Sequence, residues 1–138
     1  MDKRRVAFAA MVAVLVGIAV LTQVTIAPSL AQPKVTGTIT EKTIKEFTGL
    51  NIPGIKSVKY VRATWKPGAK VENATQSEGT DLCEARRGVI FATLGDGTKA
   101  SFKAGDIFIL PLGLKFKVVT VDRKVGYEEF YWRIVPAK

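Results

Sequence analysis

The charged side chains of this chain offer acid–base and anion-binding chemistry. Proton transfer could involve four carboxylates: Asp81, Glu84, Glu128 and Glu129. An anionic substrate could be held by one of three arginines: Arg62, Arg86 and Arg133. The chain contains no histidine, so imidazole cannot act as a metal ligand, a general base or a proton shuttle anywhere in it.

The sequence offers no pair of a nucleophile and a general base for nucleophilic catalysis. The serines and Cys83 lack a histidine base. Glu128 and Glu129 are neighbours, so along a strand they point to opposite faces and do not converge. The sequence therefore favours binding or interaction over catalysis, and an enzyme without a metal stays an alternative.

Glycines and a proline divide the second half of the chain at regular spacings. Gly68 is followed after five residues by 74–76 (Ala-Thr-Gln), then after four by Asp81, and after six more by Gly88. A second series runs from Gly105 through five residues to Pro111-x-Gly113, then through two to Phe116 and through three to Thr120. Glycine permits tight reversals and proline fixes the entry to a strand, so the spacings predict turns.

These two series resemble the two motifs of the cupin family, which are small β-barrels of the jelly-roll type. In that family the first motif carries two histidines and a glutamate, and the second carries a third histidine, which together hold a divalent metal ion. The resemblance implies that Ala74, Gln76, Asp81 and Phe116 occupy the positions of those ligands. One carboxylate and one amide do not supply the three or four converging donors that such an ion needs, so we expect no metal and no cofactor.

Strand-like alternation covers the chain after residue 32. Residues 35–40, 42–47, 58–65, 89–94, 99–102, 107–110, 115–121 and 127–135 read as short strands separated by turn residues. The alternation aims Phe116 inward together with Val118 and Thr120, and it sets Glu129, Tyr131 and Arg133 on one side of the last strand. The prediction is an all-β fold, a single cupin-type jelly-roll barrel over 56–138 with strands and a linker over 32–55.

Residues 1–31 read as an export segment. A basic start at 2–5 precedes an apolar run over 6–21, and Ser29-Leu30-Ala31 offers the small residues of a cleavage site. The apolar residues over 6–27 could instead form a retained membrane anchor. Both alternatives predict an exported protein, periplasmic or held at the inner membrane, preceded by an apolar helix.

Charge and cysteine content limit the partners. The formal charge is +9, and it is +7 without residues 1–31, because 18 basic and 11 acidic residues then remain. The basic residues alternate with apolar ones, which predicts a solvated strand face and no nucleic-acid partner. Cys83 is the only cysteine, so it forms no internal disulfide and is either a buried apolar side chain or an intermolecular link.

The expected function is the binding of a small apolar or anionic organic molecule, or an accessory interaction role. The expected pocket contains Ala74, Gln76, Asp81 and Phe116, with Arg62, Trp65, Arg86 and Trp132 as further contacts. The alternatives are a membrane-tethered structural subunit of an envelope complex and a metal-independent enzyme with a small anionic substrate. A homodimer formed through sheet edges is implied by the family resemblance.

Overall fold

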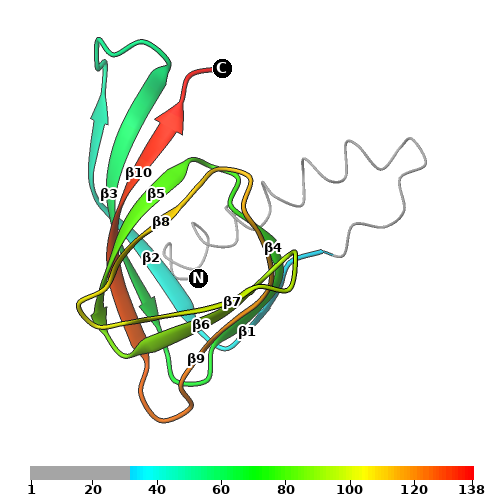
Figure 1. The fold of residues 1–138 in the computed structure, drawn as a ribbon. Helices are drawn as coiled ribbons and strands as arrows, with labels where there is room; N and C mark the ends of the chain where they lie inside the picture. Colours follow the sequence, from blue (N-terminus) through cyan, green and yellow to red (C-terminus); the bar gives the residue numbers. More distant parts are fainter. Residues whose placement is uncertain (1–31) are drawn as a thin grey trace.

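The computed structural model describes residues 32–138, which form ten strands and contain no helix (Figure 1). The strands are β1 (Lys34–Thr36), β2 (Ile39–Thr48), β3 (Ile55–Trp65), β4 (Lys70–Thr75), β5 (Thr80–Arg87), β6 (Val89–Leu94), β7 (Lys99–Lys103), β8 (Ile107–Leu110), β9 (Lys115–Val121) and β10 (Tyr127–Pro136). The all-β prediction is confirmed for this range. The expected export or anchor segment, 1–31, lies outside the described residues.

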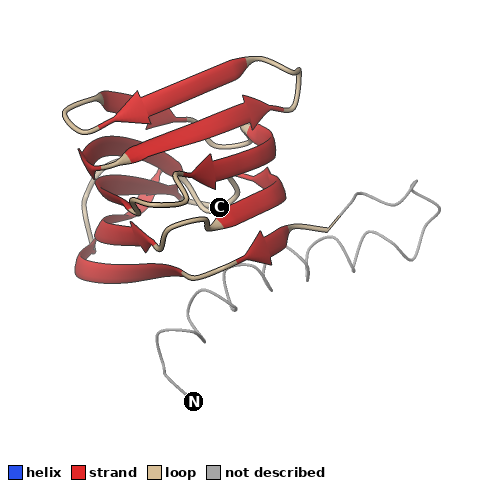
Figure 2. Ribbon diagram, turned by 90° about the horizontal axis from the view of Figure 1, so that it is seen from below, coloured by secondary structure: helices blue, strands red, loops and turns tan. Residues whose placement is uncertain are grey.

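Two five-stranded antiparallel sheets form the walls of the molecule. One sheet has the order β1-β4-β9-β6-β7 and the other has the order β2-β3-β10-β5-β8. Figure 2 shows strands from both sheets stacked around a common interior. The segment 32–55 contributes β1 to one sheet and β2 to the other, so it forms part of both walls.

The β2–β3 hairpin is longer than the other hairpins and projects beyond the barrel together with the end of β10 (Figure 1). The chain reverses between β2 and β3 with Gly49 and Gly54 at φ angles of 66° and 80°, a region that favours glycine. Among residues 32–138 no helix is long and apolar enough to span a membrane.

The inward face of β9 changes phase at a bulge, which corrects one expectation. Phe116 pairs with Ala74 and Val119 pairs with Val71, and all four residues face the interior although three positions separate them along each strand. Two irregularities accompany this change of the inward-facing side. Asn73 on β4 has a left-handed φ of 55°, and the register of β6 against β9 shifts between Thr93 and Leu94.

The expectation that Val118 and Thr120 share the inner face with Phe116 is therefore wrong. Both residues line a shallow depression on the other face of the sheet, together with Phe91 and Thr93. Simple alternation failed here because an extra residue in a strand shifts every following side chain to the opposite face. Phe116 itself faces inward, as expected.

The core lies between the sheets in two adjoining clusters. The larger includes Ile90, Val119 and the fully buried Tyr127. The smaller includes Val61, Tyr131 and Cys83, and this thiol is free and buried. Burial raises the pKa of Cys83, with the negative charge of Glu129 adding to the effect, so the thiol is not activated as a nucleophile.

The predicted turn glycines adopt turn conformations. Gly68, Gly105 and Gly113 have φ angles of 75°, 96° and 88°. Gly88 has a further constraint, because a Cβ atom there would lie 2.1 Å from the carbonyl oxygen of Gly126. Only glycine lets the start of β6 pass this close to the loop before β10.

Candidate ligand cavity

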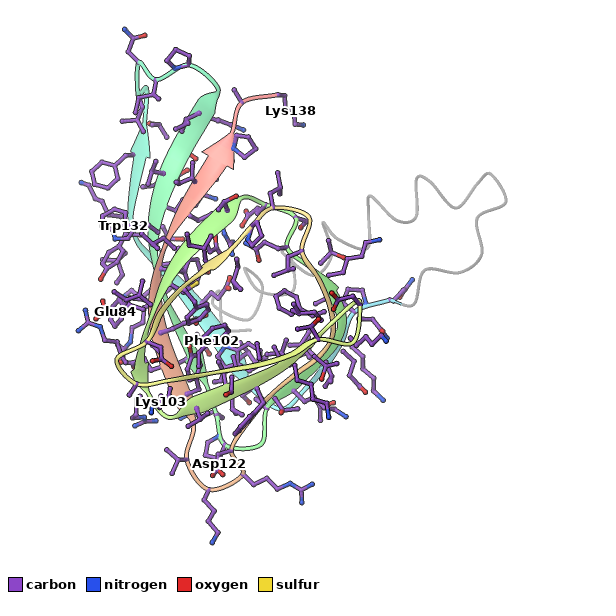
Figure 3. All side chains as sticks on the ribbon, viewed as in Figure 1. Glu84, Phe102, Lys103, Asp122, Trp132 and Lys138 are labelled. Carbon is purple, nitrogen blue, oxygen red and sulfur yellow. The ribbon has the colours of Figure 1, made fainter. Side chains whose placement is uncertain are left out.

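A cavity of about 150 Å³ lies between the two sheets. Most of its wall is apolar, and the largest contributors are Trp65, Ile90, Phe102, Phe108 and Phe116. Phe102 and Phe108 stack with ring centroids 3.8 Å apart, and Figure 3 shows Phe102 on the inner side of its strand. The interior therefore contains space that these side chains do not fill.

The four positions that match the metal ligands of the family all line this cavity: Ala74, Gln76, Asp81 and Phe116. Ala74 and Phe116 are directly paired between β4 and β9. Gln76 follows β4, where its backbone N–H donates to Leu114 at 2.8 Å and its side-chain Nε2 donates to the carbonyl of Gly79 at 2.9 Å. The two motifs are thus held together by hydrogen bonds at one end of the cavity.

Asp81 is bound by an arginine from the neighbouring strand. Arg133 on β10 donates from Nε to Oδ1 and from Nη2 to Oδ2 of Asp81, both at 2.8 Å, and these residues are only 3% and 2% exposed. The third nitrogen, Nη1, bonds to Glu78. This bidentate geometry satisfies both oxygens of Asp81 with a full positive charge.

Two further carboxylates line the same wall. Tyr131 donates from its hydroxyl to Oε1 of Glu41 at 2.7 Å, and Tyr127 donates to Oε2 of Glu129 at 2.8 Å. Burial raises the pKa of Glu129 to about 7, although the Tyr127 bond opposes the change, and the negative charges of Glu41 and Asp81 raise it further. Burial is also the main cause that raises the pKa of Glu41.

Among the other expected contacts, Trp65 lines the cavity, but Arg62, Arg86 and Trp132 do not. Arg62 pairs with Glu128, and Arg86 pairs with Glu84 at 3.0 Å. Trp132 is 41% exposed and stacks on Tyr60 with centroids 4.5 Å apart. Figure 3 shows Trp132 and Glu84 on the outer side of the sheet. The structure thus places Arg62, Arg86 and Trp132 on the outer face of the sheet, away from the cavity.

The sequence interpretation did not assign Glu41 or Tyr131 to the pocket, and it named Arg133 only as one of three arginines that could hold an anionic substrate. A usable pattern existed for two of them, because the alternation in β10 places Tyr131 and Arg133 on the same face as Glu129. No comparable pattern identified Glu41, since β2 carries charged residues at several consecutive positions and only its pairing with β3 reveals which side faces inward.

The donors at the cavity do not fit a metal ion. Asp81 is engaged through both oxygens by Arg133, and Ala74 and Phe116 carry no donor atom. Within residues 32–138 no group of three or more histidine, cysteine, aspartate or glutamate side chains is arranged to hold a metal. Glu41 and Glu129 each accept a tyrosine hydroxyl instead of converging on one point with Asp81.

Comparison with solved structures identifies the fold. The cupin domain of Cnp3 from Schizosaccharomyces pombe superposes with a TM-score of 0.56 at 15% identity, covering 80% of this chain and 74% of that one. A cupin-like protein from Thermotoga maritima gives 0.55 at 14% identity, covering 72% and 70%. The polyketide cyclase RemF from Streptomyces resistomycificus gives 0.54 at 11% identity, covering 70% and 64%.

The chain therefore has the fold of the cupin superfamily, and the resemblance drawn from its glycine spacings is confirmed at the level of the fold. No family model matches the sequence, and no curated protein is significantly similar to it in sequence. The solved structures with this fold differ in function, so the fold alone does not assign an activity.

Proposed function

We propose that this chain is an exported, metal-free cupin that binds a small organic molecule in its barrel without transforming it. The observation that carries the proposal is the cavity of about 150 Å³, whose lining includes the residues that the sequence resemblance matches to metal ligands. The four corresponding residues, Ala74, Gln76, Asp81 and Phe116, all contribute to its wall. Export is supported by the basic and apolar pattern of residues 1–31.

The size and lining of the cavity support a small ligand. Ligand sites are mostly apolar with a few polar groups in defined positions, and this wall has that composition. A mostly apolar cavity of about 150 Å³ is large enough for a benzene-sized molecule. The Arg133–Asp81 pair holds the polar part of the wall in one geometry, so ligand binding does not have to order these side chains.

Xenon uptake followed by NMR tests whether this space is open. Dissolved xenon should shift the methyl resonances of Val71, Ile90 and Val119, which line the cavity, and it should leave those of the exposed Ile107 unchanged. Replacing Ala92 by leucine should fill part of the space and reduce the shifts. Equal shifts at inner and outer methyl groups, or none at the inner ones, would refute an open binding cavity.

A second candidate is a metal-independent enzyme. Its support is the position of Glu129, a buried carboxyl with a pKa near 7 at the edge of the cavity, because acid–base groups work best near the ambient pH. One structural neighbour is named as a polyketide cyclase, which shows that this fold can support chemistry. Turnover lost in Glu129→Gln and retained in Glu128→Gln would favour this candidate.

An accessory interaction role is the third candidate, either as a soluble subunit or as one tethered to the membrane through residues 6–27. A cluster of aromatic residues on the outer face of β2, β3 and β10 supports it, because Trp132 stacks on both Phe47 and Tyr60. The homodimer and an envelope partner stay predictions. Fractionation of cells and the N-terminal sequence of the recovered protein would separate the cleaved form from the tethered one.

A further inference from the structure

The charges on the cavity wall are unequal in number. Three carboxylates line it, those of Glu41, Asp81 and Glu129, and Arg133 is the only cationic side chain among its described lining residues. Asp81 and Arg133 neutralise each other through their paired hydrogen bonds. Glu41 and Glu129 each accept a hydrogen bond from a tyrosine hydroxyl, which carries no charge. The positive charge of Arg133, which Asp81 and Glu78 already share, offsets theirs only in part.

Arg133 is already committed to acidic partners. It bonds to both oxygens of Asp81 and also to Glu78 on the β4–β5 connection. An anionic ligand would therefore have to displace a buried carboxylate before it reached the guanidinium, and breaking such a pair is unfavourable. This arrangement argues against the anionic ligand that the sequence suggested.

The two remaining carboxylates occupy one row across the inner face of the sheet. Ala63 on β3 pairs with Glu41 on one side and with Glu129 on the other. Glu129 pairs in turn with Ala85 on β5. Two strand spacings separate the two glutamates by about 10 Å at the backbone, and both side chains line the same cavity.

The opposite sheet offers an apolar surface. Phe102 on β7 and Phe116 on β9 present aromatic rings to the cavity from that sheet. Trp65 and Phe108 add two further rings from the sheet that carries the carboxylates. Aromatic faces attract cations as well as apolar groups. A molecule with an apolar body and one positively charged end would thus find complementary chemistry on both walls.

We infer that the ligand of this cavity is a small organic cation, an amine with a compact apolar body, whose charged end lies between Glu41 and Glu129. This inference rests on the proposed binding function and specifies its ligand class. It excludes carboxylates and phosphates of similar size. Burial raises the pKa values of both carboxyl groups, and a cation beside them lowers the cost of keeping them ionised.

Three probes of nearly equal size and different charge test the inference: benzylamine, benzyl alcohol and benzoate. Their affinities would be measured by isothermal titration calorimetry at pH 8, where benzylamine is charged. We expect benzylamine to bind at least about tenfold more tightly than benzoate or benzyl alcohol, the ratio expected for a hydrogen bond to a charged group. Glu129→Gln should reduce the advantage of benzylamine about tenfold, and Glu41→Gln should have the same direction of effect.

The matched control is Glu128→Gln, which changes the same functional group one residue away on the outer face and should leave all three affinities unchanged. Benzoate binding as tightly as benzylamine would overturn the inference. Equal binding of benzylamine and benzyl alcohol would also overturn it and leave the binding function standing. If no probe binds, both the inference and the binding function fail.

Discussion

Arg133 donates two parallel hydrogen bonds to Asp81, each 2.8 Å long, and Asp81 is the residue that the sequence resemblance matches to a metal-binding glutamate of the cupin family. A carboxylate held in this way cannot also coordinate a cation through the same lone pairs. The negative charge of this buried carboxylate is balanced by a guanidinium group. The pair forms a rigid polar part of the wall, with open volume beside it.

Removing Arg133 should destabilise the protein strongly. Arg133→Met leaves Asp81 buried without its partner, which typically costs about 3 to 5 kcal/mol of the free energy of unfolding. Replacing Asp81 by leucine in the same chain should recover most of that loss. Urea unfolding of the single and double variants would measure both effects.

The control for this prediction is Arg62→Met, which removes an exposed partner of Glu128 and should cost less than about 1 kcal/mol. If Arg133→Met and Arg62→Met gave the same small loss, the buried pair would not have the structural role described above.

Stability should fall as the pH rises from about 4.5 to 7. The folded state holds the proton of Glu129 up to a pKa of about 7, whereas the unfolded chain releases it near 4.5. The stabilisation is complete below the lower value and lost above the higher one, and it amounts to about 3 kcal/mol. Glu41, Asp81, Arg133 and Tyr127 face this carboxyl, and the raised pKa of Glu41 acts in the same direction.

Glu129→Gln removes that titration, so the variant should lose less stability than the parent between pH 5 and pH 8. Urea unfolding at both pH values gives the comparison, and an NMR titration of the Glu129 side-chain carbon gives its pKa directly. A midpoint near 4.5 in the folded protein would contradict the prediction.

Gly88→Ala should be among the most damaging small substitutions in the chain. The added carbon would lie 2.1 Å from the Gly126 carbonyl oxygen, and the φ of 76° is also unfavourable for alanine, so we expect a loss of about 3 kcal/mol or more. Gly97→Ala isolates the cost of the backbone conformation, because Gly97 has a φ of 90° and open space around it. Its cost should be about 1 to 2 kcal/mol, and equal melting temperatures of the two variants would show that the close approach is unimportant.

Phe116→Ala should enlarge the cavity and widen its ligand range. Deleting a partly buried ring should cost about 2 to 3 kcal/mol, below the cost for a fully buried phenylalanine. The variant should accept 1-naphthylmethylamine, which is too large for the parent cavity of about 150 Å³. Phe130→Ala removes a ring stacked on Tyr60 at the outer face and should not change the size of the ligand accepted, so calorimetry of both variants with this amine decides the point.

The all-β fold could be predicted from sequence because its determinants are local. Strand alternation and turn glycines depend on a few neighbouring residues, and they placed Gly68, Gly105 and Gly113 in reversals. The same alternation correctly predicted that Phe116 faces inward, but it predicted the wrong face for Val118 and Thr120 because no local sequence pattern indicates a bulge. Asn73, in a left-handed conformation normally taken by glycine, carries that change of direction.

The polar wall of the cavity depends on contacts that no local pattern contains. Glu41 and Tyr131 are 90 residues apart in sequence and share a hydrogen bond, and Arg133 meets Asp81 across 52 residues. Sequence alternation placed Glu129, Tyr131 and Arg133 on one side of a strand but did not identify that side as the inner one. The pairing of β2 with β3 and of β10 with β5 determines which side faces the interior.

The two tryptophans of the chain lie on opposite faces of one sheet. Trp65 borders the cavity, and Trp132 is exposed at the outer surface. Replacing Trp132 by phenylalanine would leave a single indole fluorophore, beside the interior space. Its fluorescence emission would then report ligand occupancy of the barrel, so the unlabelled protein could be screened against metabolite libraries by fluorescence.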